Sequence, residues 1–307
     1  MVKRWLLFFL VVCFFPSFLV AGTQDQQYVA ALDNSVNAAL VYFPMDQNGM
    51  LSEPGNFHLG CRGTETDLES SGTIARAHGN QFLVIVCPGS HQVVVVERMS
   101  DRFQVTDVVP SKGFHPVSAS AHEDRVCAVN AGGSQIGTVA CWHLSLQGKL
   151  TAIPGSLQNL SKVGSKPAQI RFSPSGKYLV VSERIKHGLA VYGLREHGLT
   201  PGVSYPTTGG EPAGFFFRKM KGGNYRLILK HGDGTVSTHN LDERTGTVYP
   251  VTASQISNVA TGLVYKGKSY IRTPEGTIEV FGKTTLLATR EGLPLNAGGL
   301  SLIEPVR

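Results

Sequence analysis

The sequence predicts an all-β fold, specifically a six-bladed β-propeller, from three observations. First, one sequence motif recurs: a Gly or Pro, a short apolar run, a turn with Gly, and a second run rich in β-branched and aromatic residues. Second, the leading runs start 44 to 51 residues apart, a period typical of four-stranded propeller blades. Third, the chain after residue 22 contains no convincing helical pattern. The copies of this motif span residues 70–86, 113–129, 165–181, 210–229 and 258–271.

Each blade continues into a third and a fourth strand. An apolar alternating run is followed by a polar turn, such as Gln47-Asn48-Gly49, and then by another run. Alternation over five to eight residues bounded by Gly, Asn or Asp indicates a β-hairpin. These third and fourth strands are predicted within residues 39–53, 138–152, 189–202 and 235–250.

The first repeat is incomplete, because the strand that begins at Tyr28 has the pattern of a second strand with no first strand before it. Residues 296–305 have the pattern of a first strand with nothing after it. We therefore expect Gly298 to Leu302 to pair beside Tyr28 to Leu32, which would close the ring and leave no open sheet edge. This count gives six blades, and seven blades are the alternative. The second strands begin near Tyr28, Phe82, Val126, Tyr178, Tyr225 and Tyr270.

The first 22 residues are predicted to be a secretory signal peptide. Lys3 and Arg4 precede an apolar run to Val20, and Ala21-Gly22 supplies small residues for cleavage. The run is shorter than the ~20 residues of a membrane helix, so an uncleaved anchor is the weaker alternative. The sequence thus predicts a secreted or periplasmic protein whose residues 23–307 form a single propeller domain.

Charge and motifs exclude several functions. The formal net charge is +6, and the basic residues are dispersed with no nucleic-acid footprint. The chain contains no nucleotide-binding or serine-hydrolase motif, and its ten histidines fall at no metal-ligand spacing. The sequence therefore predicts a monomer that binds no nucleic acid, no metal and no cofactor.

Four cysteines follow the leader, and an even number in a secreted chain favours disulfides over buried free thiols. Cys127 and Cys141 are expected on neighbouring strands of one hairpin, facing each other. Cys61 precedes a first strand and Cys87 ends the next second strand, which places both toward the same rim. We therefore predict the pairs Cys61–Cys87 and Cys127–Cys141.

Candidate functional residues lie in the connections that gather at one face of a propeller, where loops carry function. Carboxylate or imidazole groups can act as acid or base, which nominates Glu183, His115 and His231 as catalytic. Cations with a carboxylate suit an acidic ligand or developing negative charge. The predicted ligand-binding residues are Arg184, Lys166, Glu211, Arg62, Asn130 and Lys230. The alternative is that these residues have no functional role and are polar because the rim of a propeller is exposed to solvent.

The blades resemble those of the lactonase-family β-propellers, which include bacterial phosphogluconolactonase and fungal carboxymuconate cyclase. The likeness lies in PAQIRFSPSGKYLVVSE, with its Phe-Ser-Pro-x-Gly turn, and in VNAGGSQIGTVACWHLSLQGKLTAIPGS. It covers roughly residues 28–303. Two features differ: the family usually has seven blades, and its active members tend to carry Arg-His just after the first-strand proline. Here those places hold Val117-Ser118, Ala168-Gln169 and Ala213-Gly214.

Two function classes follow. The absent Arg-His favours a propeller that binds an acidic small molecule, a protein or a glycan on its rim without catalysis. The resemblance implies the alternative, an enzyme that opens or forms a lactone ring on an acidic small molecule.

Overall fold

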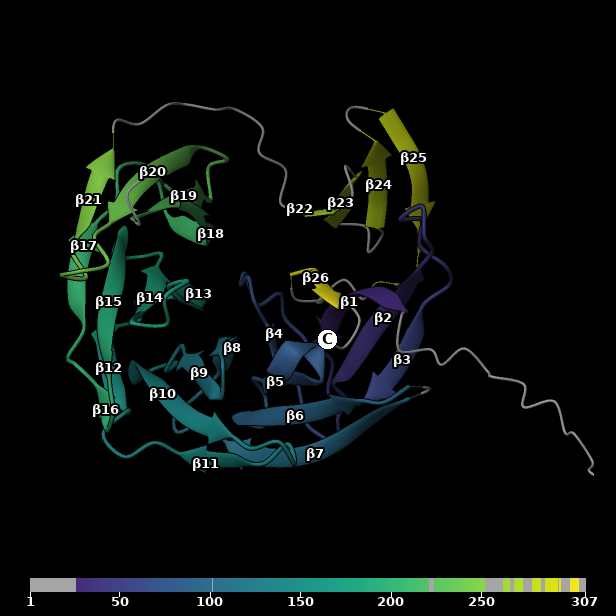
Figure 1. The fold of residues 1–307 in the computed structure, drawn as a ribbon, viewed down its shortest axis with the longest axis horizontal. Helices are drawn as coiled ribbons and strands as arrows, with labels where there is room; N and C mark the ends of the chain where they lie inside the picture. The colour runs from purple at the N-terminus through teal and green to yellow at the C-terminus, as the bar shows by residue number, and fades with distance from the viewer. Residues whose placement is uncertain are drawn as a thin grey trace, which may run out of the picture.

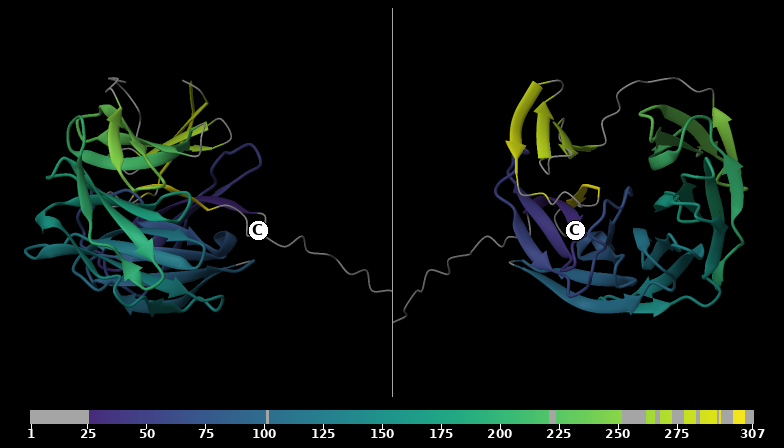
Figure 2. Two further views of the ribbon diagram at one scale, coloured as in Figure 1. Left: turned by 60° about the vertical axis from the view of Figure 1, so that its left-hand side comes forward. Right: turned by 180° about the vertical axis from the view of Figure 1, so that it is seen from behind.

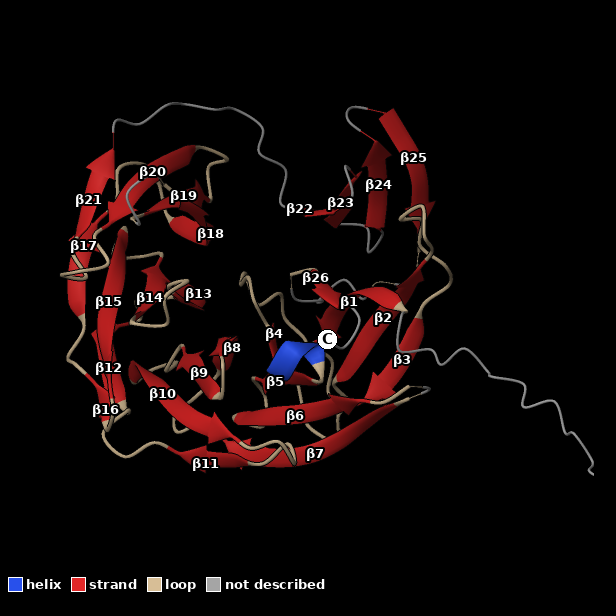
Figure 3. Cartoon of the chain, in the orientation of Figure 1, coloured by secondary structure: helices blue, strands red, loops and turns tan. Residues whose placement is uncertain are grey.

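A computed structural model describes residues 26–100, 102–220, 224–251, 262–265, 268–272, 278–282, 285–291, 293 and 299–303. The predicted signal peptide lies outside these residues. Within them the chain is all-β, and its one helical piece is a 3-10 turn at His78–Asn80 (Figure 3). No helix in the described ranges is long and apolar enough to cross a membrane.

The described strands form six sheets, each antiparallel between neighbours. In the first sheet the strand order is β26 (Ser301–Ile303), β1 (Gln27–Asp33), β2 (Ala39–Met45), β3 (Gly55–His58). In the second it is β4 (Ile74–Ala77), β5 (Phe82–Cys87), β6 (Gln92–Arg98), β7 (Phe103–Pro110). The third contains β8 (Pro116–His122), β9 (Arg125–Asn130) and β10 (Ile136–Leu144), and β10 pairs with both β11 (Leu150–Ala152) and β12 (Gln158–Val163).

The remaining three sheets follow in chain order. The fourth contains β13 (Pro167–Phe172), β14 (Tyr178–Glu183) and β15 (Gly188–Arg195), and β15 pairs with both β16 (Gly198–Leu199) and β17 (Val203–Pro206). The fifth is β18 (Pro212–Lys219), β19 (Tyr225–His231), β20 (Val236–Leu241), β21 (Val248–Val251). The sixth is β22 (Gly262–Tyr265), β23 (Lys268–Arg272), β24 (Ile278–Gly282), β25 (Thr285–Arg290).

The sheets stand around a common centre, with the first strand of each sheet innermost (Figure 1). The view from behind shows the same arrangement (Figure 2). The predicted repeat is therefore confirmed as a propeller-like array of sheets. The described strands begin within two residues of all five predicted leading positions. β8, β13 and β18 start at the predicted Pro116, Pro167 and Pro212, whereas β4 starts at Ile74 rather than Gly72 and β22 at Gly262 rather than Ala260.

The predicted pairing of the two chain ends is confirmed. β26 lies antiparallel to β1, with Ala30 opposite Ser301 and Tyr28 opposite Ile303. The described strand starts at Ser301 rather than at Gly298, which lies outside the described residues. Ile303 is fully buried, so the C-terminal strand contributes to the core as well as to the sheet.

The core lies between neighbouring sheets. β5 is FLVIVC and every residue in it is buried, as expected of a β-branched and apolar strand covered on both faces. One buried cluster joins the first three sheets, and others join the third to the fourth, the fourth to the fifth, and the sixth to the first. Stacking of each sheet on the next is the packing that a propeller requires.

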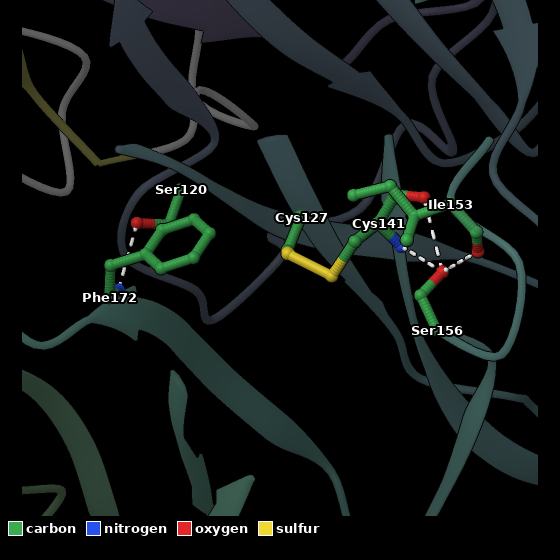
Figure 4. The surroundings of a disulfide bond; sticks show 6 residues. All are labelled: Ser120, Cys127, Cys141, Ile153, Ser156 and Phe172. Carbon is green, nitrogen blue, oxygen red and sulfur yellow. Dashed lines mark hydrogen bonds between the residues drawn. A yellow bond between two sulfur atoms is a disulfide. The ribbon is translucent and has the colours of Figure 1, made fainter. Parts of the chain in front are cut away.

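Both predicted disulfides are present. Cys61 and Cys87 join the first connection to the end of β5, with Cα atoms 6.1 Å apart. Cys127 and Cys141 are directly opposite in the β9–β10 ladder, with Cα atoms 4.1 Å apart. Beside this pair the Ser156 hydroxyl donates to the Ile153 carbonyl and accepts from the Cys141 N–H (Figure 4). The hydroxyl thus fixes the turn after β11 against the disulfide-bearing strand.

Candidate functional site

The connection between the first and second sheets crosses the centre of the molecule. It spans residues 59–73, whereas the equivalent connections span only 111–115, 164–166 and 207–211. The Ser71 N–H donates to the Ala168 carbonyl at 2.9 Å, and the Ser70 hydroxyl donates to the same carbonyl at 2.8 Å. The Ser118 hydroxyl donates to the Ser71 carbonyl at 2.8 Å. Residues 70–72, here called the crossing segment, are therefore bound to the innermost strands β8 and β13.

Small side chains let the crossing segment fit. Gly72 has a φ of +80°, and a Cβ there would lie 2.9 Å from the Ser118 hydroxyl, so a larger residue is excluded by conformation and by contact. Gly214 on β18 passes equally close, because its Cβ would lie 2.8 Å from the Ser71 hydroxyl. Ser118 and Gly214 are among the positions that the Arg-His pair would occupy in the active relatives. In this chain Ser118 contacts the Ser71 backbone carbonyl and Gly214 lies against the Ser71 side chain.

A cluster of charged residues stands beside the crossing segment. Arg184 follows β14 and its guanidinium forms ion pairs with Glu69, which precedes the crossing segment, and with Glu211, which precedes β18. The Arg184 Nη2 to Glu211 Oε2 distance is 3.0 Å. The Arg184 N–H donates to the Lys166 carbonyl at 3.1 Å. The side chains of Glu69 and Glu211 thus meet at the Arg184 guanidinium, and the loop of Lys166 is joined to Arg184 through the backbone. We call these four residues the Arg184 cluster: Glu69, Lys166, Arg184 and Glu211.

Glu183 points to different partners. Its side chain is 1% exposed, and its carboxylate accepts hydrogen bonds from the Ser161 N–H at 3.2 Å and from the Ser161 hydroxyl. Ser161 lies on β12, so this contact joins the third sheet to the fourth. Burial, together with the charge of Glu183, raises the pKa of Tyr192. Glu183 is therefore held between two sheets, not at the Arg184 cluster.

Two other predicted site residues are also buried within the fold. His231 is fully buried, and its ring nitrogens lie 2.8 Å from the Gly210 carbonyl and 2.7 Å from the Ser237 hydroxyl. Asn130 is fully buried and donates to the Ser111 carbonyl at 3.0 Å. The side chains of Glu183 and His231 are both turned into the packed protein, so the structure does not bring either of them to an open site beside the Arg184 guanidinium.

His115 is exposed and lies in a second group of loop residues. Its ring stacks on His91, with centroids 5.1 Å apart, and its backbone N–H lies 3.2 Å from His91 Nδ1. Burial and the neighbouring His91 lower the pKa of His115. The loop of His91 contacts Arg62, whose N–H donates to the Ser90 hydroxyl at 3.2 Å. Among the described residues, no hydrogen bond or ion pair joins His115 or Arg62 to the Arg184 cluster.

The predicted lysines differ in environment. Lys166 is exposed and has a φ of +47°, a left-handed conformation that is unusual outside glycine. Lys230 is half-buried on β19, and burial lowers its pKa. Within the described part of the chain, neither lysine side chain forms an ion pair.

Sequence reasoning missed Glu69, Ser161 and the crossing segment. The available signal was the length of the connection over residues 59–73, which also carries several carboxylates. Ser161 gave no signal, because a serine on an outer strand looks like any surface residue until the neighbouring sheet covers it.

A cavity of about 380 Å³ lies at the opposite end of the fourth sheet. Its lining includes Tyr178 at the start of β14, Tyr205 on β17 and Arg195 at the end of β15. Glu183 ends β14, so this cavity is separate from the Arg184 cluster. Among the described residues no group of three or more His, Cys, Asp or Glu side chains is placed to hold a metal ion.

Comparison with known proteins supports the resemblance seen in the sequence. Residues 138–263 match the family model described as lactonase, 7-bladed beta-propeller. The resemblance to lactonase-family propellers is therefore confirmed, at a diverged level. No curated protein sequence matches the chain.

Solved structures share the fold at low identity. The periplasmic gluconolactonase of Pseudomonas aeruginosa is 12% identical with a TM-score of 0.52, over 91% of this chain and 99% of that one. A candidate 6-phosphogluconolactonase from Bacteroides fragilis is 15% identical with a TM-score of 0.55, over 88% and 83%. A protein from Lactobacillus plantarum is 15% identical with a TM-score of 0.59, over 92% and 86%. At such identities the likeness shows a shared fold, and an activity has to be argued from the residues of the site.

Proposed function

We propose that this protein is a lactonase-type enzyme that acts on an acidic small molecule at the Arg184 cluster. The observation that carries the proposal is a single arginine, 17% exposed, held between two carboxylates at the loop face. A partly buried guanidinium binds carboxylates and developing oxyanions strongly. A carboxylate beside it can accept a proton from water. The cluster therefore combines the two groups that hydrolysis of a lactone needs.

The proposed step uses Glu211 and Arg184. Glu211 takes a proton from a water molecule, whose oxygen attacks the lactone carbonyl carbon. Arg184 donates hydrogen bonds to the oxygen on which negative charge develops. The bond between the carbonyl carbon and the ring oxygen then breaks, and the ring oxygen receives the proton to give a hydroxy acid. The predicted catalytic roles of Glu183, His115 and His231 have less geometric support than this pair.

The comparisons favour this function over the non-catalytic one. The matched segment, residues 138–263, contains both Arg184 and Glu211. Two of the similar structures are described as a gluconolactonase and as a candidate 6-phosphogluconolactonase, and both names denote sugar lactones that open to acids. An acidic sugar derivative is thus the substrate class that we propose.

The second candidate is a propeller that binds an acidic ligand, protein or glycan without catalysis. It is favoured by Ser118, Gln169 and Gly214, which stand where active relatives tend to carry Arg-His. Of these, Ser118 donates hydrogen bonds to the crossing segment and Gly214 packs against it. In this alternative the Arg184 cluster binds an anion and no bond is broken.

A panel of lactones incubated with the mature protein separates the two candidates. The lactonase proposal predicts hydrolysis above the buffer rate, reduced at least 100-fold by Arg184→Ala and by Glu211→Gln. Lys186→Ala is the matched control, because it removes an exposed cation two residues away and should retain activity. Binding of the product acids without any hydrolysis would support the second candidate instead.

The finer architecture belongs to the same proposal. We propose a single domain over residues 23–307, with six blades closed by β26 and monomeric in solution. The two disulfides are compatible with a secreted or periplasmic location, and cleavage of the leader near Ala21-Gly22 would place the protein there.

A further inference from the structure

The ion pair between Glu69 and Arg184 joins residues that are distant in sequence. Glu69 precedes the crossing segment, and Arg184 follows β14 in the fourth sheet. The Glu69 carboxylate is 57% exposed, whereas the Arg184 side chain is 17% exposed. The cation is thus mostly enclosed, and Glu69 is the more exposed of its two counter-ions, since the Glu211 side chain is 37% exposed.

We propose that Glu69 is an internal competitor for the ligand of Arg184. This inference rests on the proposed function, in which a small molecule with a carboxylate binds Arg184. The Glu69 carboxylate presents to the guanidinium the same chemical group as such a ligand. An acidic ligand therefore binds by exchange with Glu69, and Glu69 lowers its apparent affinity.

The backbone near Glu69 allows this exchange. Residues 70–72 are fixed by hydrogen bonds to β8 and β13, including the Ala119 N–H to the Gly72 carbonyl at 2.8 Å. Glu69 stands just outside this fixed part, with a φ of +47° and its N–H bonded to Asp67 at 3.0 Å. Its side chain can rotate into solvent without breaking any of the hydrogen bonds that hold the crossing segment.

Arg184 also offers donors to a ligand. Glu69 binds Nη1 and Glu211 binds Nη2, at 3.0 Å, so each carboxylate holds a different terminal nitrogen. A ligand carboxylate that replaced Glu69 would bind Nη1 through a charge-assisted hydrogen bond of the same kind. Glu211 would keep the guanidinium in place during the exchange.

The test is calorimetric titration of D-gluconate into the wild type, four single variants and the double variant Glu69→Gln with Arg184→Ala. Glu69→Gln and Glu69→Ala remove the competing charge, Glu65→Gln removes a nearby exposed charge on the same connection, and Arg184→Ala removes the site. An exposed ion pair of ordinary strength corresponds to a factor of up to about five in an equilibrium constant. We expect both Glu69 variants to bind about fivefold more tightly, and Glu65→Gln to bind as the wild type.

The outcomes separate this inference from the proposed function. Tighter binding in the Glu69 variants, lost in Glu69→Gln combined with Arg184→Ala, supports the competitor. Unchanged binding in both Glu69 variants, with weaker binding in Arg184→Ala, contradicts competition by Glu69. The proposal that Arg184 binds the ligand is then retained. Absence of binding in the wild type and in both Glu69 variants, with thermal melts showing that all are folded, overturns both for this substrate class.

Discussion

Glu183 and Arg184 are neighbours in the chain, and their side chains serve different parts of the molecule. Glu183 is buried against Ser161 on β12, whereas Arg184 forms ion pairs with Glu69 and Glu211. The two residues stand where β14 ends, and successive side chains of a strand point to opposite faces. One therefore stabilises the contact between two sheets, and the other joins the loops of Glu69 and Glu211 through ion pairs.

Replacement of Glu183 should lower stability. Glu183→Ala removes a buried carboxylate that accepts two hydrogen bonds, and bonds to charged groups contribute about 1.5–3 kcal/mol each. We expect the free energy of unfolding to fall by about 3–6 kcal/mol in urea titrations. In a double-mutant cycle with Ser161→Ala the coupling should be at least about 1 kcal/mol, since the two residues share the contact. Additive effects would contradict this role.

The disulfides should stabilise the fold by similar amounts. Closing loops with sequence separations of 26 and 14 reduces the entropy of the unfolded chain and contributes about 3–4 kcal/mol each. Paired Cys→Ser replacement at Cys61 and Cys87, or at Cys127 and Cys141, should lower the unfolding free energy accordingly. Mass spectrometry of the secreted protein that found four free thiols would refute both pairs.

His239 should make stability depend on pH. Its side chain on β20 is fully buried, and neither ring nitrogen has a hydrogen-bond partner among the described residues. Burial, with a smaller contribution from the nearby His231, lowers its pKa to about 4. In the unfolded chain the pKa is about 6.5, so between these values the unfolded state binds more protons and stability rises with pH.

This contribution is complete above about pH 6.5 and is lost as the pH falls toward 4. Its full size is roughly 3 kcal/mol, from 1.36 kcal/mol per pKa unit over about 2.5 units. His239→Leu keeps the volume approximately and removes the titration. Denaturant titrations from pH 4 to 7 should therefore show a shallower dependence in the variant, and an identical dependence in both proteins would argue against His239 as the source.

Removal of the C-terminal strand should greatly destabilise the protein. A chain that stops at residue 295 lacks β26, which pairs with β1 and buries Ile303. The edge of β1 would then be exposed to water and to other chains. We expect loss of a cooperative thermal transition in the truncated protein. A truncated chain that melts like the full-length protein would contradict closure by this strand.

The propeller-like fold was predictable because its signal is repeated. Each blade repeats the same order of Pro or Gly, apolar run and turn. An error in assigning one blade therefore does not change the assignment of the others. The pairing of β26 with β1 followed from an unmatched strand at each end of the chain. The disulfide between Cys127 and Cys141 followed from their positions on the two strands of one hairpin.

The site was less predictable, because its members are assembled by the packing of sheets. Arg184 and Glu211 were identified since each lies next to a strand end. Glu183 also lies at a strand end, yet its side chain is buried because β12 of the neighbouring sheet covers it, and the sequence does not specify where β12 lies. Glu69 depends on the path of a long connection across the centre, which no local pattern specifies.

The position of a bound acid tests the central claim most directly. A crystal structure of the protein with D-gluconate should show the ligand carboxylate within hydrogen-bond distance of the Arg184 guanidinium, with Glu211 beside the same ligand. A ligand bound instead in the cavity between Tyr178 and Tyr205, with the Glu69–Arg184 ion pair intact, would contradict the account.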